Sequence, residues 1–581
     1  MKKINILAFC KNKPCPNVYQ LGVSMNNQKI LIVGGVAGGA SAAARLRRLN
    51  ENAEIIMFEK GEYISFANCG LPYYIGGEIQ TKSHLILQTP QSFQERFNVD
   101  VRTQSEVIAI NQDTKTVTIR NCGNKQEYFE HYDKLILSPG ATPILPPMVT
   151  ATSHRIFTLR NIPDTYKIKD FISQHKPDTA AVVGGGYIGV ELAENLHNAG
   201  VNVTIIEMQN QVIAPLDFDM ACEVHRHIED KGIKLMLDTL VRGIQETKTG
   251  LSIEVDSGKI QVDMLIMAIG VKPETAITRN TNIATNARGA ILVNDQMQTT
   301  NNDIYAVGDA IEIVDFITGQ KGMIPLAGPA NKQGRIAADN ISGLSSRYDG
   351  TQGSAIIKVF DMTVATTGIN EKTAKRLSLD YDKAFTYSSS HAGYYPGATN
   401  MSIKTIYEKE TGKILGAQLV GFEGVDKRCD VLATAIRFGA TDQDLTKLEL
   451  CYAPPFSSAK DPVNMIGYVI GNQRNKQVKI FHWHDVEKLP QDGSVTLLDT
   501  RTSSEFAAGH IHGFINIPVD ELRMRFDELD RSKPIYVTCQ IGLRGYIACK
   551  ILGGKGYNCY NLSGGFRLYN SIFNNNNEKG V

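Results

Sequence analysis

Long apolar runs, an excess of one charge and regularly spaced cysteines are all missing from the sequence. No apolar run approaches the roughly 18 residues of a membrane span. The net charge is only +1, so neither a membrane nor a nucleic acid is expected as a partner. The short apolar run at residues 4–9 is followed closely by Lys11, which argues against a secretory signal.

The 10 cysteines are scattered without the spacing of a disulfide framework or a zinc site. This distribution favours a reducing compartment, and hence a cytoplasmic location, with a few reactive thiols and no metal. With 581 residues of ordinary globular composition, the chain is long enough for about four domains.

A strand, a glycine-rich turn and a helix are predicted near the start of the chain. Residues 29–33 form a buried apolar run, and residues 40–49 have helix-forming composition. In such a unit the helix N-terminus faces a dinucleotide pyrophosphate, and an acid ending the next strand accepts ribose hydroxyls. Val36 replaces the usual middle glycine, and an ordinary tight turn is the alternative. The residues assigned to this cofactor site are Gly34, Gly35, Gly38, Gly39 and Glu59.

A second unit of the same kind begins with a strand predicted at residues 180–183. Its turn has the complete G-x-G-x-x-G pattern, followed by a helix predicted at 190–199 and a strand at 201–207. An acid at the end of that strand pairs with a free ribose 2′-hydroxyl and repels a 2′-phosphate. This favours NADH, with NADPH as the remaining possibility. The residues assigned to this site are Gly184, Gly186, Tyr187, Gly189 and Glu207.

Three further strands are predicted to end at a glycine. Residues 135–143 and 264–273 contain matching patterns, at Gly140 and Gly270, that predict crossings between two domains. The strand at residues 304–310 ends in Gly308 and Asp309, where an acid can hold a ribityl hydroxyl of a flavin. Two nucleotide sites in one chain indicate electron transfer between two cofactors.

Cys69 lies in the segment 65–77, directly after the first unit. The second cysteine of a C-x4-C redox pair is absent, because residue 64 is Ile and residue 74 is Tyr. Cys69 is therefore predicted to be a single redox thiol beside a flavin. Its place at a helix start is expected to supply thiolate character.

These features carry a family resemblance. The chain resembles the flavoprotein disulfide reductases with two dinucleotide-binding domains. Within them it is similar to the coenzyme A disulfide reductases with a fused rhodanese domain, also described as NADH-dependent persulfide reductases. The resemblance covers about residues 28–575, and its most specific part joins residues 65–73 to residues 451–462.

The resemblance implies an α/β protein with two Rossmann-like dinucleotide-binding domains, an α+β dimerisation domain and a C-terminal α/β rhodanese domain. A homodimer is implied as well, and residues 471–475 are expected to be a polar linker. The expected boundaries are an N-terminal extension at 1–27, an FAD-binding domain at 28–150 and 275–345, an NAD(P)H-binding domain at 151–274, a dimerisation domain at 346–470, a rhodanese domain at 476–575 and a disordered tail at 576–581.

The resemblance also implies site residues outside the glycine turns. Tyr394 and Tyr452 map to two catalytic tyrosines, whose phenols can donate a proton to a leaving thiol; by spacing alone, both are ordinary packing residues. Six residues map to contacts with coenzyme A: Ser41, Arg45, Arg48, Ser65, Asn68 and Lys460. Arg45 replaces a glutamine, and two polar contacts of the family are lost at Asn331 and Phe97.

The rhodanese resemblance centres on a six-residue loop from Cys539 to Arg544, which follows a strand predicted at 534–538 and opens a helix. Successive backbone N–H groups at a helix N-terminus stabilise an anion and lower a thiol pKa, and Arg544 adds positive charge. Cys539 is therefore predicted to carry a persulfide; the alternative is a buried structural cysteine. Four other residues are predicted to be structural: Asp499, Arg501, Cys549 and Cys559.

The predicted function is FAD-dependent, NADH-driven reduction of coenzyme A disulfide, coenzyme A persulfide or polysulfide at Cys69, with sulfane sulfur delivered on Cys539. The expected partners are small thiols, disulfides and persulfides, and a second copy of the chain. Two alternatives stay open. One is an NADH oxidase or peroxidase that cycles through a cysteine sulfenic acid. The other is a sulfurtransferase or sulfur relay whose flavin domain serves as a redox sensor.

Overall fold

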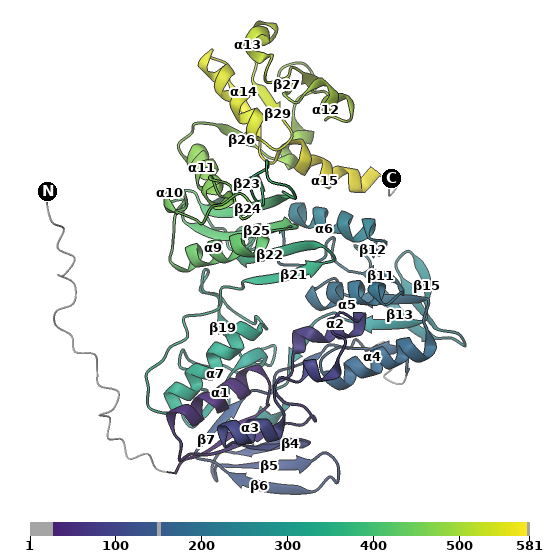
Figure 1. Cartoon of the computed structure of the whole chain (residues 1–581), viewed down its shortest axis with the longest axis vertical. Helices are drawn as coiled ribbons and strands as arrows, with labels where there is room; N and C mark the ends of the chain where they lie inside the picture. Colours follow the sequence, from purple (N-terminus) through teal and green to yellow (C-terminus); the bar gives the residue numbers. More distant parts are fainter. Residues whose placement is uncertain (1–26, 148–152, 578–581) are drawn as a thin grey trace, which may run out of the picture.

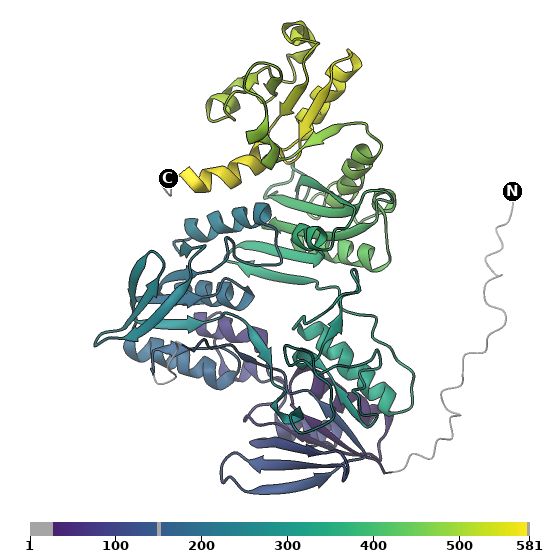
Figure 2. The same cartoon turned by 180° about the vertical axis from the view of Figure 1, so that it is seen from behind.

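The computed structural model describes residues 27–147 and 153–577. The expected N-terminal extension, apart from residue 27, and residues 578–581 of the expected tail lie outside this range. The last helix continues to Asn577, two residues into the segment expected to be disordered. Figures 1 and 2 show the first strand–glycine turn–helix unit at one end of the molecule and the C-terminal domain at the other.

The first unit is built on five parallel strands in the order β18–β7–β1–β2–β3. Its strands are β1 Lys29–Val33, β2 Glu54–Phe58, β3 Asp100–Arg102, β7 Lys134–Leu137 and β18 Ile304–Ala306, and its helices are α1 Ala37–Leu49, α2 Leu71–Gly76, α3 Pro90–Phe97 and α7 Ala327–Ile341. The central strands are continuous apolar runs because both sheet faces are covered. Helices α1 and α7 pack closely, since a Cβ on Gly334 would lie 2.2 Å from the carbonyl oxygen of Gly38.

The second unit repeats this parallel arrangement, in the order β12–β11–β10–β16–β9. Its elements are β9 Ile156–Phe157, β10 Thr179–Val183, β11 Asn202–Ile206, β12 Lys234–Met236, β16 Met264–Met267, α4 Ile162–His175, α5 Tyr187–Asn198 and α6 Phe218–Asp230. Each unit also carries a three-stranded antiparallel sheet. These sheets are β4 Ser105–Asn111, β5 Thr116–Asn121 and β6 Glu127–His131 in the first unit, and β13 Val241–Glu246, β14 Leu251–Val255 and β15 Gly258–Val262 in the second.

Two crossings join these units, as the glycine patterns predicted. Strand β8 (Ala141–Pro143) pairs antiparallel with β17 (Val271–Pro273). The glycines just before these strands take left-handed backbone angles, with φ of +75° at Gly140 and +119° at Gly270. Only glycine adopts such angles without strain, so both glycines are needed where the chain changes direction.

The third unit is a five-stranded antiparallel sheet in the order β21–β22–β25–β24–β23. Its elements are β21 Ala355–Val359, β22 Met362–Gly368, β23 Tyr381–Ser389, β24 Asn400–Glu408, β25 Ile414–Gly421, α8 Glu371–Arg376, α9 Val425–Arg437, α10 Asp442–Lys447 and α11 Pro462–Arg474. The linker expected at 471–475 is wrong for its first four residues, which complete α11. Arg474 ends this helix in an ion pair of 2.6 Å with buried Asp442, which holds the polar segment in helical form.

The C-terminal unit is a parallel sheet in the order β26–β30–β29–β27–β28. Its elements are β26 Lys479–Phe481, β27 Thr496–Asp499, β28 Ile515–Asn516, β29 Ile535–Thr538, β30 Cys559–Leu562, α12 Ser503–Ala507, α13 Leu522–Arg525, α14 Leu543–Gly554 and α15 Gly565–Asn577. Asp499 and Arg501, which were predicted to be structural, form a buried salt bridge of 2.7 Å. Cys549 on α14 and Cys559 on β30 are buried, as predicted. The α/β fold class is confirmed.

The C-terminal unit is held against the second and third units by apolar packing, in which Leu568 and Ile572 join a shared buried cluster, and by polar contacts. Helix α15 packs on α6, as Figure 1 shows. The Trp483 indole N–H donates to Asp219 at 3.3 Å. Beside it, the fully buried Lys404 of the third unit forms ion pairs with Asp217 (3.1 Å), Asp219 (2.8 Å) and Glu371 (2.7 Å). These contacts fix how the C-terminal unit sits on the rest of the chain.

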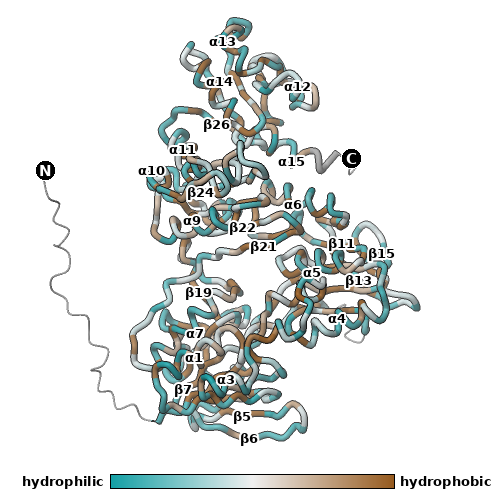
Figure 3. The backbone as a smooth tube through the Cα atoms, in the orientation of Figure 1, coloured by the Kyte–Doolittle hydropathy of each residue, from teal (hydrophilic) through white to brown (hydrophobic). Residues whose placement is uncertain are grey.

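No helix in the described residues is both long and apolar enough to cross a membrane. Figure 3 shows hydrophilic and hydrophobic segments alternating throughout the fold.

Candidate functional site

The first glycine turn has the geometry of a dinucleotide cradle. Gly34 has a φ of +94°, and a Cβ there would lie 2.1 Å from the carbonyl oxygen of Ser138. A Cβ on Gly39 would lie 1.9 Å from the carbonyl oxygen of Gly34, so α1 can begin this close to the turn only because both residues are glycine. The Glu59 carboxylate accepts the N–H of Gly35 at 3.0 Å, which places an acid beside the turn.

The second turn repeats this geometry. Gly184 has a φ of +109°, and a Cβ on Gly189 would lie 1.9 Å from its carbonyl oxygen. A Cβ on Gly186 would meet no atom within 4 Å, so the space in front of the turn is open to a ligand. Glu207 accepts the N–H of Gly185 at 2.6 Å. The residues present therefore fit a dinucleotide at each turn.

Cys69 lies in a 3-10 turn, Asn68–Gly70, at the start of the short helix α2, and its side chain is exposed. Burial by the surrounding protein, and then the charges of Glu191 and Asp309, raise the pKa of its thiol. The helix start was expected to favour the thiolate; the polypeptide around Cys69 has the opposite effect. Glu191 lies on α5 of the second unit, and Asp309 lies in the 3-10 turn Gly308–Ala310 that follows β18 of the first. Charges from both units therefore act on the Cys69 thiol.

Glu191 and Tyr73 are neighbours of Cys69 that the sequence patterns missed. Helix α2 packs on α5, and the Tyr73 hydroxyl donates to Glu191 at 3.3 Å. Burial raises the pKa of Glu191 to about 7. The only available signal was its position two residues after Gly189, on the helix that begins at the second turn.

Asp309 is held in an ion pair with Arg160, 3.1 Å away. The Arg160 guanidinium also lies over Gly140, where a Cβ would be 3.0 Å from its nitrogen. Gly308 has a φ of +80°, and its N–H donates to Gln333 on α7 at 2.8 Å. Asp309, Gly140 and the first glycine turn thus converge on one region, and Arg160 is a further member that the sequence patterns did not mark.

The six residues mapped to coenzyme A contacts do not form one cluster in a single chain. Ser41, Arg45 and Arg48 lie on α1, and Ser65 and Asn68 flank Cys69, all within the first unit. Lys460 is exposed in the third unit, between Tyr452 and α11. Arg45 forms an ion pair of 2.6 Å with Asp339, which compensates its charge, whereas Arg48 is exposed. These six assignments stay predictions.

The structure joins the two tyrosines that the sequence placed 58 residues apart. The hydroxyls of Tyr394 and Tyr452 are 2.8 Å from each other. Their segments are tied together because the N–H of Ala392 donates to the carbonyl of Ser457, whose hydroxyl donates to buried Asp461. Tyr394 is 76% exposed and Tyr452 49% exposed. Within the described residues, neither tyrosine is hydrogen-bonded to the Cys69 loop.

Cys539 ends β29, and its sulfur lies inside the loop that opens α14. The N–H of Gly542 points at the sulfur from 3.1 Å, so the predicted amide cradle is present. Burial outweighs the N–H groups of Gly545, Ile541 and Gly542, and the pKa of the Cys539 thiol lies above its usual value. The loop alone was expected to lower this pKa. The pKa is raised because the side chain is fully buried, and burial removes the water that would stabilise the charged thiolate.

Glu505 is the partner of Arg544 and was not marked by the sequence patterns. Arg544 forms two charge-assisted hydrogen bonds with this carboxylate, of 2.6 and 2.7 Å. Hydrogen bonds from Arg544 lower the pKa of Glu505 to about 2. Part of the Arg544 charge is therefore neutralised at the mouth of the Cys539 loop.

Comparison with known proteins covers nearly the whole described chain. Residues 28–334 match the pyridine nucleotide-disulphide oxidoreductases, residues 354–462 the dimerisation domain of that family, and residues 482–571 the rhodanese-like domain. Coenzyme A disulfide reductase of Staphylococcus epidermidis is 39% identical, over 76% of this chain and 99% of its own.

Two solved structures extend the similarity through the C-terminal unit. Reduced CoADR-RHD of Bacillus anthracis is 51% identical with a TM-score of 0.92, covering 94% of this chain and 99% of the other. The NAD-dependent persulfide reductase of A. fulgidus is 36% identical with a TM-score of 0.88, covering 93% and 100%.

Proposed function

The chain belongs to the pyridine nucleotide-disulphide oxidoreductase family, and on this premise we propose that it uses NADH and FAD to reduce coenzyme A disulfide or coenzyme A persulfide at Cys69. The family uses a flavin and a pyridine nucleotide, and the chain also carries a rhodanese-like domain. One observation carries the proposal. The exposed thiol of Cys69 lies at the start of α2, which packs on α5 of the second unit, while the Cys539 thiol lies in an amide cradle in the C-terminal unit.

The two glycine turns would hold the two nucleotides. Gly34, Gly39 and Glu59 suit FAD, with Asp309 for its ribityl chain, and Gly184, Gly186 and Glu207 suit NADH. The Glu207 carboxylate would accept a ribose 2′-hydroxyl and repel a 2′-phosphate, which supports NADH over NADPH. When bound, the flavin supplies two-electron transfer between the nicotinamide and Cys69.

Cys69 would act by thiol–disulfide exchange. Its thiolate attacks one sulfur of coenzyme A disulfide, the S–S bond breaks, and one coenzyme A leaves as a thiolate. Two electrons from NADH then cleave the mixed disulfide and release the second coenzyme A. The pKa of about 7 at Glu191 lets this residue hold or release a proton beside Cys69 near neutral pH.

Tyr394 or Tyr452 would donate a proton to the leaving coenzyme A thiolate, which then departs as the thiol. The hydrogen bond from Tyr452, with a minor effect of burial, raises the pKa of Tyr394. Both rings are exposed on the domain that matches the dimerisation domain of the family. We propose that the chain is a homodimer in which this pair completes the Cys69 site of the other copy.

Cys539 would carry sulfane sulfur. A donor transfers its outer sulfur to the Cys539 thiolate, and the N–H groups around the sulfur stabilise the resulting persulfide anion. The product of transfer to coenzyme A is then a persulfide that can be reduced at Cys69.

Anaerobic NADH oxidation tests the proposal. The substrates are coenzyme A disulfide, coenzyme A persulfide, polysulfide and hydrogen peroxide, with the wild type, Cys69→Ser, Cys539→Ser and the control Cys122→Ser. Cys69→Ser should lose activity with every sulfur substrate, Cys539→Ser should lose only activity that needs a sulfane donor, and Cys122→Ser should match the wild type. Full activity in Cys69→Ser would overturn the proposal.

The same experiment separates the two alternatives. A sulfenic-acid oxidase or peroxidase would use peroxide better than any sulfur substrate. A sulfur relay with a sensing flavin would consume no NADH with any of these substrates, and a separate assay would show sulfur transfer from thiosulfate to thiols.

A further inference from the structure

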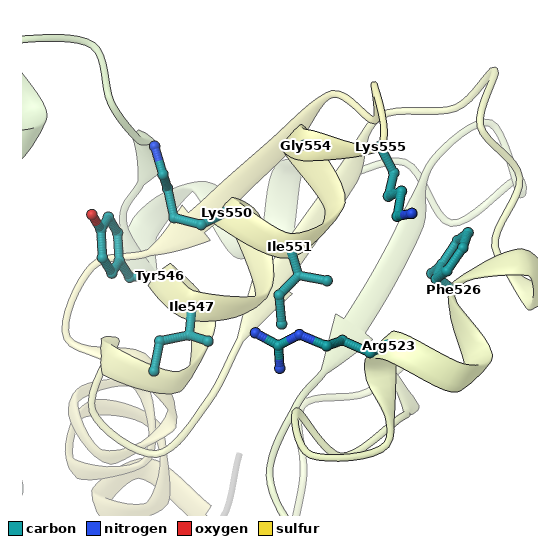
Figure 4. A pocket seen from close by; sticks show the side chains of 8 residues that line it. All are labelled: Arg523, Phe526, Tyr546, Ile547, Lys550, Ile551, Gly554 and Lys555. Atoms are coloured by element: carbon teal, nitrogen blue, oxygen red, sulfur yellow. The ribbon is translucent and has the colours of Figure 1, made fainter.

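A cavity of about 640 Å³ lies in the C-terminal unit, outside every site residue named above. It runs between α13 and the outward side of α14 (Figure 4). Its lining residues are Arg523, Phe526, Tyr546, Ile547, Lys550, Ile551, Gly554 and Lys555. We call this cavity the α13–α14 groove.

The groove combines an apolar floor with uncompensated positive charge. Figure 4 shows the Arg523 guanidinium ending beside Ile551 and Lys555 pointing toward Phe526, whose ring centre is 5.0 Å from the ammonium. Lys550 stands on the opposite rim, where its ammonium donates to the carbonyl oxygen of Gln477 at 3.3 Å. In the described part of the chain, none of the three cations is within ion-pair distance of a carboxylate. Nearby Arg525, by contrast, is paired with Glu521 and Glu528, at 2.8 and 2.7 Å. Such a groove suits an anion with an apolar portion.

The groove leads toward the Cys539 loop. Its α14 residues recur every four positions, at 546–547, 550–551 and 554–555, so they form one stripe along the helix. The next position of that stripe is Leu543, which is 55% exposed at the end of the loop. From Leu543 to Lys555 the helix rises about 18 Å, which is comparable to an extended pantetheine arm.

The depth of Cys539 restricts what can reach it. The side chain is fully buried inside its loop, so a broad protein surface cannot approach the sulfur, and the acceptor has to be a narrow group. Anionic phosphates, an apolar arm and a terminal thiol occur together in coenzyme A.

We propose that the α13–α14 groove binds coenzyme A as sulfur acceptor, with its phosphates near Arg523, Lys550 and Lys555 and its thiol at Cys539. This inference rests on the proposed function, which makes coenzyme A a substrate of the chain. The coenzyme A thiolate attacks the outer sulfur of the Cys539 persulfide, and its thiol proton goes to solvent. The bond between that sulfur and Cys539 breaks, Cys539 leaves as a thiolate facing the Gly542 N–H, and coenzyme A persulfide is released. The sulfane sulfur comes from a donor such as thiosulfate, which leaves as sulfite.

Sulfite release from thiosulfate, measured anaerobically without NADH on the full flavin-bound protein, tests the inference. Acceptors are coenzyme A, pantetheine, which lacks the phosphates, and cyanide, which lacks both arm and phosphates. Arg523→Ala and Lys555→Ala should each raise KM for coenzyme A by about threefold to tenfold. Their kcat, and their activity with cyanide, should stay at wild-type values. The control Lys533→Ala removes a lysine of the same domain that pairs with Asp530 outside the groove, and should change nothing.

Two results would overturn the inference: wild-type KM for coenzyme A in both groove variants, or equal KM for pantetheine and coenzyme A in the wild type. With the first result, the occupant that fits the groove would be an acidic protein segment instead of coenzyme A. If Lys555→Ala also loses activity with cyanide, Lys555→Arg is measured instead. A wild-type KM for coenzyme A in Lys555→Arg supports binding in the groove, and a raised KM refutes it. NADH-dependent reduction of coenzyme A disulfide, run in parallel, should be unaffected in the groove variants. Absence in the wild type of NADH-dependent reduction of both coenzyme A disulfide and coenzyme A persulfide would overturn the proposed function while leaving the NADH-free result to be judged separately.

Discussion

Replacing Lys404 with methionine should lower the free energy of unfolding by about 3–5 kcal/mol at neutral pH. Lys404 is fully buried, with Asp217, Asp219 and Glu371 at 3.1, 2.8 and 2.7 Å. Methionine keeps most of the side-chain volume but leaves these carboxylates without their shared cation. When one partner of a buried ion pair is removed, the desolvation cost of the other is no longer offset by their attraction. In Lys404→Met this applies to three carboxylates at once.

The loss should depend on pH in a defined direction. Burial acts to raise the pKa of Glu371, but Lys404 and Lys383 overcome it and hold this pKa far below the usual range. A carboxyl with a depressed folded-state pKa contributes stability above its unfolded pKa, and this contribution is lost as the pH falls. The difference between the wild type and Lys404→Met should therefore shrink as the pH drops below about 4, where the orphaned carboxylates can take up protons.

The fluorescence of Trp483 reports on the contact between the C-terminal unit and the second unit. Trp483 is the single tryptophan of the chain, and its indole N–H donates to Asp219. Urea unfolding followed by its fluorescence should show the first transition at lower urea in Lys404→Met. Lys375→Met is the matched control: Lys375 also pairs with Glu371, at 2.9 Å, but is 63% exposed, so its loss should cost less than about 1 kcal/mol. Equal midpoints for the two variants would refute the reasoning.

Three further predictions concern the sites. Gly184→Ala should abolish NADH binding in a titration while flavin stays bound, because its Cβ would lie 2.4 Å from the Ala268 carbonyl oxygen; Gly200→Ala, also at positive φ but with nothing within 4 Å, should retain binding. Glu191→Gln should shift the pH profile of Cys69 alkylation to lower pH, because the ionised Glu191 adds to the burial that raises the pKa of that thiol; an unchanged profile would contradict this. Arg544→Gln should slow sulfur transfer through Cys539 at pH 7 by about tenfold. The pH profile of this transfer should move to higher pH, because Arg544 favours the Cys539 thiolate. The control Arg525→Gln, which breaks an exposed ion pair of the same domain, should match the wild type.

Local patterns predicted the two glycine turns because their geometry depends on neighbouring residues. At Gly34 and Gly184 the positive φ and the missing side chain are demanded by the turn itself. A parallel strand buried on both faces has to be apolar throughout, so β1 and β10 were also visible in the sequence. The linker expected at 471–475 failed for the opposite reason: polar composition was taken as a loop, whereas a distant partner, Asp442, holds Arg474 in the helix.

Charge effects at the two thiols could not be predicted from the loops that carry them. Cys69 is affected by Glu191, which lies 122 residues later in the chain (191 − 69 = 122), and Arg544 is neutralised by Glu505, which lies 39 residues earlier. A helix start or an amide loop favours a thiolate, but the pKa depends on every charge and on the burial around the sulfur.

The sequence by itself determined the fold class, the two nucleotide-binding turns, the single thiol at Cys69 and the loop around Cys539, because each rests on residues close together in the chain. Only the tertiary structure decided which groups surround those thiols, how the C-terminal unit is held through Trp483 and Asp219, and that α13 and α14 line a cationic groove. Those features arise where elements from distant segments pack together, and their energies depend on burial and distance, which no local pattern records.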